Sequence, residues 1–275
     1  MLKTVDGIAH EYASRSAAIK SAWYSAAAAS YERVRPEYPS EVIANIVSKT
    51  GIGAKSRLLE IGSGPGTATQ SFAELGCTME CVEPNPHFVE IVRQRFESNP
   101  NILVHESTFE EYHHTSELVD AIIAATSFHW VERQIAFAKT ASLIKSSGFL
   151  ILLWNHELQP LEEDGGPISQ IYKRFAPELS PVEEESQIVA KLKSISNWVR
   201  GSDHFLPPHF GFVVTSVRYT AERYIDALQS YSPYLQLDKE VKNKLLQAIF
   251  DLVKLKHGNA IDLKYITGYH IAQKA

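Results

Sequence analysis

Three glycines and two carboxylates lie where a ligand-binding loop would need them. The segment LLEIGSGPG, residues 58–66, places glycine at positions 62, 64 and 66. The apolar run at its start is typical of a short buried strand. Glycine lacks a Cβ, so the chain can turn tightly and a ligand can approach the backbone. Glu60 precedes the first glycine, and Glu83 ends the next apolar run.

The residues after the loop predict a helix, which places the loop within a known type of fold. TATQSFAEL follows Gly66, and Thr67 suits the helix N-cap. A strand, a glycine turn and a helix form the first unit of a doubly wound α/β sheet, whose ligands bind at the carboxyl ends of the strands. The dinucleotide fingerprint needs a glycine where Thr67 stands, and the GK of a phosphate-binding P-loop is missing.

The pattern E-x-G-x-G-x-G, with CVEPN downstream, resembles motif I of the class I S-adenosylmethionine-dependent methyltransferases. This resemblance implies S-adenosylmethionine as the cofactor. It places Glu60 near the amino acid end of the cofactor. It also implies that the loop residues make room for the sugar and methionine portions, and these are Gly62, Ser63, Gly64 and Gly66.

Two flanking segments extend the resemblance. YERVRPEYP is similar to a segment that precedes motif I in many small-molecule members, where Tyr31 and Arg35 would reach the methionine end. An arginine can hold a carboxylate bidentately, although a surface ion pair is the alternative for Arg35. Glu83, at the tip of the second strand, would accept hydrogen bonds from the ribose hydroxyls, with helix capping as the alternative. Pro84 would lie against one face of the adenine.

The later motifs concern the adenine and the methyl group. By resemblance, Thr108 and Phe109 meet the adenine edge, although the family more often has Asp where Thr108 stands. TSFHWV, after the apolar run LVDAIIAA, resembles a subgroup that includes type 11, trans-aconitate methyltransferase-like proteins. The resemblance implies that Thr126, Ser127 and Phe128 pass under the methionine moiety.

Methyl transfer from a sulfonium needs an aligned nucleophile more than it needs acid–base groups. His129 is the candidate catalytic residue, with His156 as a second candidate base; a structural role for a His beside a Trp is the alternative. Aromatic side chains near a sulfonium add cation–π stabilisation. The candidate acceptor-pocket residues are Trp130, Trp154, His156, Trp198, Tyr231 and Tyr234.

The order of elements predicts one Rossmann-like methyltransferase domain over residues 1–275. We expect a doubly wound, seven-stranded, mostly parallel sheet with one antiparallel strand and a helical lid. Residues 1–48 would be an N-terminal helical cover and 49–154 the cofactor-binding core. Residues 155–208 would be a helical lid insertion, with flexible Gly165 and Gly166, and 209–275 would complete the sheet.

Composition limits the class of protein. The chain has 275 residues, 44% hydrophobic and 21% charged, with a net charge of −5 and no run of Lys or Arg, which argues against a nucleic-acid partner. Its longest apolar run is too short for a membrane span, and charged residues interrupt any signal-peptide core. Cys77 and Cys81 lack further zinc ligands, so we expect no metal, reduced thiols and a cytoplasmic protein, either a monomer or a weak homodimer.

Three functional classes follow from the sequence. The favoured one is a methyltransferase that acts on a small molecule. The second is a methyltransferase that acts on RNA or protein, which the acidic charge disfavours. The third is a non-enzymatic regulator that binds S-adenosylmethionine. A nicotinamide-dependent oxidoreductase is more distant, and the sequence does not identify the acceptor or the atom that is methylated.

Overall fold

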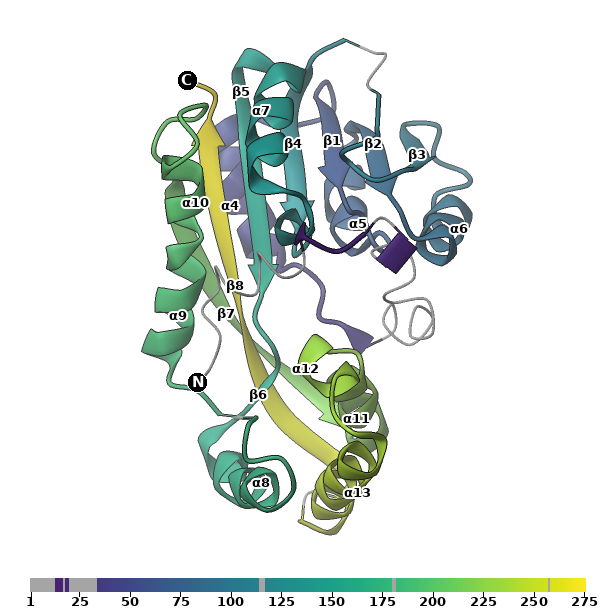
Figure 1. Ribbon diagram of the computed structural model, residues 1–275, viewed down its shortest axis with the longest axis vertical. Coiled ribbons are helices and arrows are strands. Elements are labelled where there is room, and N and C mark those ends of the chain that lie inside the picture. The colour runs from purple at the N-terminus through teal and green to yellow at the C-terminus, as the bar shows by residue number, and fades with distance from the viewer. Residues whose placement is uncertain (1–12, 17, 20–33, 114–116, 180–181, 257) are drawn as a thin grey trace.

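A central mixed sheet organises the chain (Figure 1). The computed structural model describes residues 13–16, 18–19, 34–113, 117–179, 182–256 and 258–275. The sheet has eight strands in the order β3-β2-β1-β4-β5-β8-β6, with β7 paired to β8. The predicted Rossmann-like sheet of seven strands is confirmed, and the added strand is the two-residue β6, Gln159–Pro160.

Five parallel strands form the half of the sheet that carries the glycine loop. Neighbouring strands in this half all pair in parallel register. Their continuous apolar character fits strands that are covered on both faces. The strands are β1 Arg57–Ile61, β2 Thr78–Glu83, β3 Ile102–Glu106, β4 Val119–Ala125 and β5 Ile144–Asn155.

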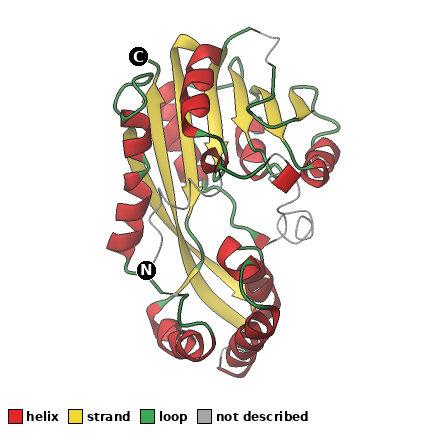
Figure 2. Ribbon diagram, viewed as in Figure 1, coloured by secondary structure: helices red, strands yellow, loops and turns green. Residues whose placement is uncertain are grey.

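Helices cover both faces of the parallel strands (Figure 2). On one face α4 (Ser40–Thr50) and α5 (Thr67–Ala73) share a core with β1, β2 and β4. On the other face α7 (Arg133–Leu143) packs over β4 and β5. The α6 helix (Pro86–Arg95) begins where Asn85 accepts hydrogen bonds from two backbone amides and Pro86 fixes the first turn. The local signals for α6 therefore agree with the fold, whereas the expected cap of α5 is wrong: Gly66 is its N-cap and Thr67 its first helical residue.

The C-terminal half adds a long antiparallel pair and a second core. β8 (Ala260–Gln273) runs antiparallel to β5, and β7 (His209–Thr220) pairs along its whole length. In Figure 1 both strands continue beyond the parallel strands into a lower lobe. Four helices surround them there and bury a tyrosine-rich core: α8 (Glu162–Phe175), α11 (Ala221–Gln229), α12 (Ser232–Leu235) and α13 (Lys239–Lys256).

The segment expected as a lid contributes buried side chains to the core beside α7 and to the tyrosine-rich core. Gly165 and Gly166 lie within α8, so the expectation of a flexible loop at these glycines is wrong. The following helices, α9 (Glu185–Ser194) and α10 (Ser196–Arg200), bury Ile188, Leu192 and Trp198 against the sheet. Closure of residues 155–208 over a ligand stays a prediction. None of the helices that the structure describes combines the length and apolar character that a bilayer crossing requires.

Candidate active site

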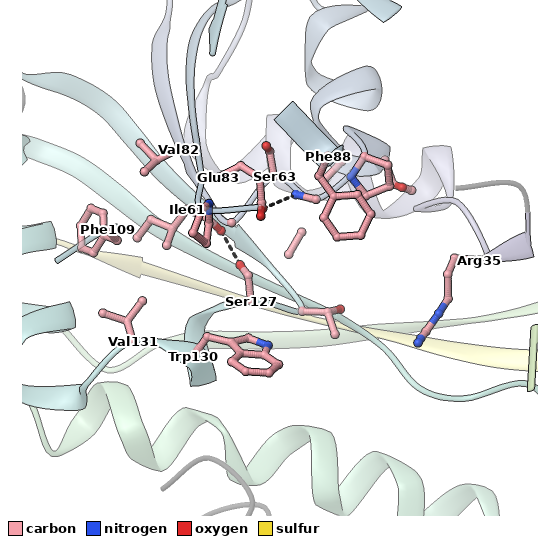
Figure 3. Close-up of a pocket in the computed structure, with 18 of the residues that line it drawn as sticks. Arg35, Ile61, Ser63, Val82, Glu83, Phe88, Phe109, Ser127, Trp130 and Val131 are labelled. Atoms are coloured by element: carbon pink, nitrogen blue, oxygen red, sulfur yellow. Dashed lines mark hydrogen bonds between the residues drawn. The ribbon is translucent and has the colours of Figure 1, made fainter. Parts of the chain in front are cut away.

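A cavity lies at the carboxyl ends of β1, β2, β4 and β5, the edge predicted to bind ligands. It contains about 1130 Å³ of empty space, including its open mouth. Figure 3 shows Glu83, Ser63 and Phe88 on one side and Ser127, Trp130 and Val131 on the other. The predicted cofactor residues that line it are Arg35, Gly62, Ser63, Gly64, Glu83, Pro84, Thr108, Phe109, Thr126 and Ser127.

The glycine loop brings the backbone of β1 close to that of β4. Gly62 has φ +65°, and a Cβ built there would lie 2.7 Å from Cβ of Ser127. Ser127 in turn donates a hydrogen bond to the carbonyl of Ile61. A side chain at position 62 would therefore be strained and would push the two loops apart. Gly66 does not line the cavity; it also has positive φ and precedes α5.

The Glu83 side chain lines the cavity, and its carboxylate binds the glycine loop. Its Oε2 accepts a hydrogen bond from the Gly64 amide and its Oε1 from the Asn85 amide, both at 2.8 Å. Burial raises its pKa to about 7, and the two amides oppose this rise. The alternative that Glu83 caps the following helix holds only in part. The Asn85 side chain caps α6, and Glu83 binds the amide of that cap residue.

Glu60 lies behind the loop and does not line the cavity. Its side chain is fully buried, and its Oε2 accepts a hydrogen bond of 2.6 Å from Thr69. Burial raises its pKa to about 8, with repulsion from Glu83 as a smaller cause. Because Glu60 lies behind the loop, its expected place near the amino acid end of the cofactor stays a prediction.

The residues after β4 divide between the cavity and the core. Thr126 lines the cavity with φ 56°, a conformation that a β-branched residue rarely adopts. Its hydroxyl lies 3.1 Å from the Tyr38 hydroxyl, and its amide donates to the Leu153 carbonyl. Phe128 instead points into the core, where its ring packs against Phe137. Phe128 therefore does not line the cavity, and its expected passage under the methionine moiety stays a prediction.

Arg35 lines the cavity, but other residues hold its guanidinium. Its Nε donates to the Ser230 hydroxyl at 2.9 Å and its Nη2 to the Ser230 carbonyl at 2.6 Å. The guanidinium carbon lies 3.9 Å from the centre of the Tyr231 ring. Arg35 is thus fixed against the C-terminal half by Ser230 and Tyr231. Tyr31 lies outside the described residues.

The six residues expected in the acceptor pocket divide into two groups. Trp130, His156 and Tyr231 line the cavity, and Trp154, Trp198 and Tyr234 do not. Trp154 and Trp198 pack edge to face in the core under α10, with ring centres 5.8 Å apart. Tyr234 forms a hydrogen bond with Tyr172 in the second core. Aromatic residue type marked all of these positions, but it did not separate core from cavity.

The two candidate bases differ in their surroundings. His129 does not line the cavity; its ring lies 5.2 Å from that of Trp154, and burial lowers its pKa to about 3. The structural alternative for His129 therefore fits its position better. His156 does line the cavity. Its Nδ1 lies 3.2 Å from the Glu157 carbonyl and its Nε2 3.5 Å from Glu183.

Several cavity residues were missed from sequence. Apolar members such as Val82, Phe88 and Val131 carry no chemical signal that separates them from core residues. Tyr38 stands in the quoted YERVRPEYP motif, and Asn155 is the last residue of the fifth strand, so both could have been found by position. Within the described ranges, His, Cys, Asp and Glu form no group of three or more that could hold a metal ion.

Comparisons with known proteins find similarity to methyltransferases. A family profile described as "Methyltransferase domain" matches residues 59–152, from β1 to β5. An uncharacterized methyltransferase of Mycobacterium tuberculosis is 24% identical over 248 residues, which is 89% of this chain and 92% of the relative. An uncharacterized methyltransferase-like protein of Schizosaccharomyces pombe is 29% identical over 152 residues, covering 54% of this chain and 58% of its own.

Solved structures share the fold at low identity. A putative type II methyltransferase from Anaeromyxobacter dehalogenans superposes with a TM-score of 0.62 at 12% identity, covering 86% of this chain and 97% of its own. A putative methyltransferase from an antibiotic biosynthesis pathway of Anabaena variabilis has a TM-score of 0.52 at 15% identity, covering 87% and 98%. At these identities the likeness supports the fold alone.

Proposed function

Because this chain is a class I S-adenosylmethionine-dependent methyltransferase, we propose that it methylates a small-molecule acceptor. The observation that carries the proposal is the continuation of the cavity from the glycine loop to Trp130, His156 and Tyr231. Two of these residues are large aromatic side chains, which suit a compact organic acceptor. We also propose that the chain belongs to the trans-aconitate methyltransferase-like subgroup.

The cavity residues fit the cofactor. Ser63 is 5% exposed, and its hydroxyl has no hydrogen-bond partner among the described residues. Such a buried polar group in a cavity wall suits a polar ligand. The Gly64 backbone leaves open the space that a Cβ would occupy, and we propose that Glu83 accepts the ribose hydroxyls. Pro84, Thr108 and Phe109 line the adjoining wall, where the adenine would lie.

When bound, the cofactor supplies a methyl group activated by its sulfonium. The task of the chain is to align an acceptor with that methyl group and to exclude water. Trp130 and Tyr231 provide apolar faces for the acceptor, and their rings can stabilise a nearby cation. Arg35 and Asn155 also line the cavity. This alignment needs no ionising side chain.

A base is required only for an acceptor that keeps its proton at neutral pH. His156 is our candidate for that case, since it lines the cavity and lies next to Glu183. This arrangement is analogous to an imidazole oriented by a carboxylate. His129, our sequence candidate, is a residue of the aromatic wall behind Trp130 in this proposal.

We keep RNA, protein and regulatory roles as alternatives. The net charge of −5 disfavours an RNA partner. Both cysteines are free and buried, which suits a reducing compartment, so we propose a cytoplasmic protein. A monomer or weak homodimer is our proposal for its assembly. A regulator would bind the cofactor and its demethylated product without turnover.

Untargeted metabolite profiling with an isotope-labelled methyl donor tests the proposal. Purified protein, a small-molecule extract and labelled S-adenosylmethionine should yield at least one labelled metabolite. The same incubation with Gly62→Ala protein is the control for background transfer. Label that appears only in RNA or protein fractions would contradict the small-molecule acceptor. Binding without any transferred label would favour the regulator.

A further inference from the structure

Residues 34–38, which we call the strap, are fastened by side chains from several distant elements. The Tyr219 hydroxyl on β7 donates to the Val34 carbonyl at 3.0 Å. The Tyr265 hydroxyl on β8 donates to the Glu37 carbonyl at 3.0 Å. Asn155, at the end of β5, donates through Nδ2 to the carbonyls of residues 36 and 37 at 3.0 and 3.3 Å. With the Arg35 contacts to Ser230, the strap is tied to three strands and to the end of α11.

Thr267 fixes the direction of the Asn155 amide. The two residues are cross-strand partners on β5 and β8, and the Thr267 hydroxyl lies 2.5 Å from Asn155 Oδ1. The strap offers only carbonyl oxygens to this amide, so the Nδ2 end must face the strap. The hydroxyl can then donate to Oδ1. Thr267 is fully buried and does not line the cavity.

The strap ends at a strained residue of the cavity wall. Tyr38 is 8% exposed, and its hydroxyl pairs with that of Thr126. Thr126 holds φ 56° although its side chain is β-branched. Such conformations persist only where the surroundings impose them, and they concentrate at functional sites. Tyr38 holds Thr126 through its side chain, while the Leu153 carbonyl holds it through its amide.

We propose that Thr267 and Asn155 are positioning residues for cofactor binding. The Thr267 hydroxyl orients the Asn155 amide, and the amide holds the strap. Through Tyr38, the strap then keeps Thr126 in its place in the cavity wall. A buried hydroxyl that lies outside the cavity therefore sets cofactor affinity. The inference does not depend on the acceptor, so it stands or falls separately from the proposed function.

Titration with S-adenosylhomocysteine, the demethylated product, tests the chain of contacts. Thr267→Val removes the hydroxyl at nearly constant volume, and we expect about fivefold weaker binding, as for the loss of one net hydrogen bond. Thr267→Ser keeps the hydroxyl and should bind like wild type. Asp262→Asn is the matched control: Asp262 lies on β8 with Thr267, the change removes an exposed ion pair with Arg218 of β7, and binding should be like wild type.

A double-mutant cycle separates positioning from general loosening of the fold. Tyr38→Phe alone should weaken binding, and adding Thr267→Val should weaken it little further, because both changes break the same chain. Additive effects, or wild-type affinity in Thr267→Val, would overturn the proposal. If Thr267→Val does not fold, Tyr265→Phe replaces it in the cycle with the same expectations, since it removes another contact to the strap.

Discussion

Removal of the Glu83 carboxylate is the most direct mutational test of the proposed cofactor site. Glu83 lines the cavity, is 6% exposed, and is held by the Gly64 and Asn85 amides at 2.8 Å each. Replacing it with alanine removes the proposed ribose acceptor. Of the two amides that it leaves, that of Gly64 lines the cavity, where water can reach it. We therefore expect Glu83→Ala to fold and to bind the cofactor weakly.

The expected magnitude follows from the chemistry of the proposed contact. A hydrogen bond to a charged group contributes about 1.5–3 kcal/mol. Water competes for the same groups in the free state, so we expect a total loss of about 2 kcal/mol for the two ribose bonds. That loss corresponds to a dissociation constant roughly 30-fold higher.

The pH dependence of cofactor affinity provides a second, independent test of the role of Glu83. The pKa of Glu83 is about 7 in the folded protein, so the carboxylate loses its charge as pH falls through 7. From pH 8 to pH 6 its ionised fraction falls about tenfold, and affinity should fall by a similar factor. Glu83→Ala should lack this step.

Isothermal calorimetry with S-adenosylhomocysteine measures both effects. Glu90→Ala is the matched control, because Glu90 is an exposed carboxylate on α6 that does not line the cavity. It should bind like wild type at both pH values. Wild-type affinity in Glu83→Ala would refute the ribose assignment and leave Glu83 as a residue that only orders the loop.

Three further predictions concern the loop, its buried acid and the helices beside it. Gly62→Ala should abolish measurable cofactor binding and cost about 2 kcal/mol in unfolding free energy, because the new Cβ would meet Ser127. Gly53→Ala, where a Cβ meets nothing within 4 Å, should do neither in the same titration and urea melt. Burial raises the pKa of Glu60 to about 8, so the stability that Glu60 contributes is complete below pH 4.5 and should fall by about 4 kcal/mol as pH rises to 8; urea melts of Glu60→Gln should show a clearly smaller fall over the same range. Hydrogen exchange of residues 155–208 should slow on product binding if they close as a lid, whereas unchanged exchange beside clear protection of the glycine loop would leave a rigid buttress.

Much of the cofactor half could be predicted because its signals are local. The apolar run and the glycine spacing of LLEIGSGPG lie within nine residues, and Glu83 ends its strand where a parallel sheet places ligand contacts. The apolar run of β4 and the Pro86 helix start depend on neighbouring residues alone. Such features need no knowledge of distant partners.

Sequence reasoning did not separate core residues from cavity residues where contacts between distant segments determine the position of a side chain. Phe128, one residue after the cavity wall, turns into the core because α7 offers Phe137 there. Trp154 and Trp198 meet only after α10 folds back on the sheet, and no local pattern encodes that contact. Glu60 has the right residue type, but Thr69 holds its carboxylate behind the loop. Likewise, the contacts of the strap join residues up to 228 positions apart.

The central claim is that the cavity beside the glycine loop is an S-adenosylmethionine site. Calorimetric titration of the wild-type protein with S-adenosylmethionine, S-adenosylhomocysteine and NAD tests it most directly. We predict binding of the first two ligands at one site per chain, with competition between them, and no binding of NAD. Micromolar affinity for NAD without affinity for S-adenosylmethionine would contradict the account.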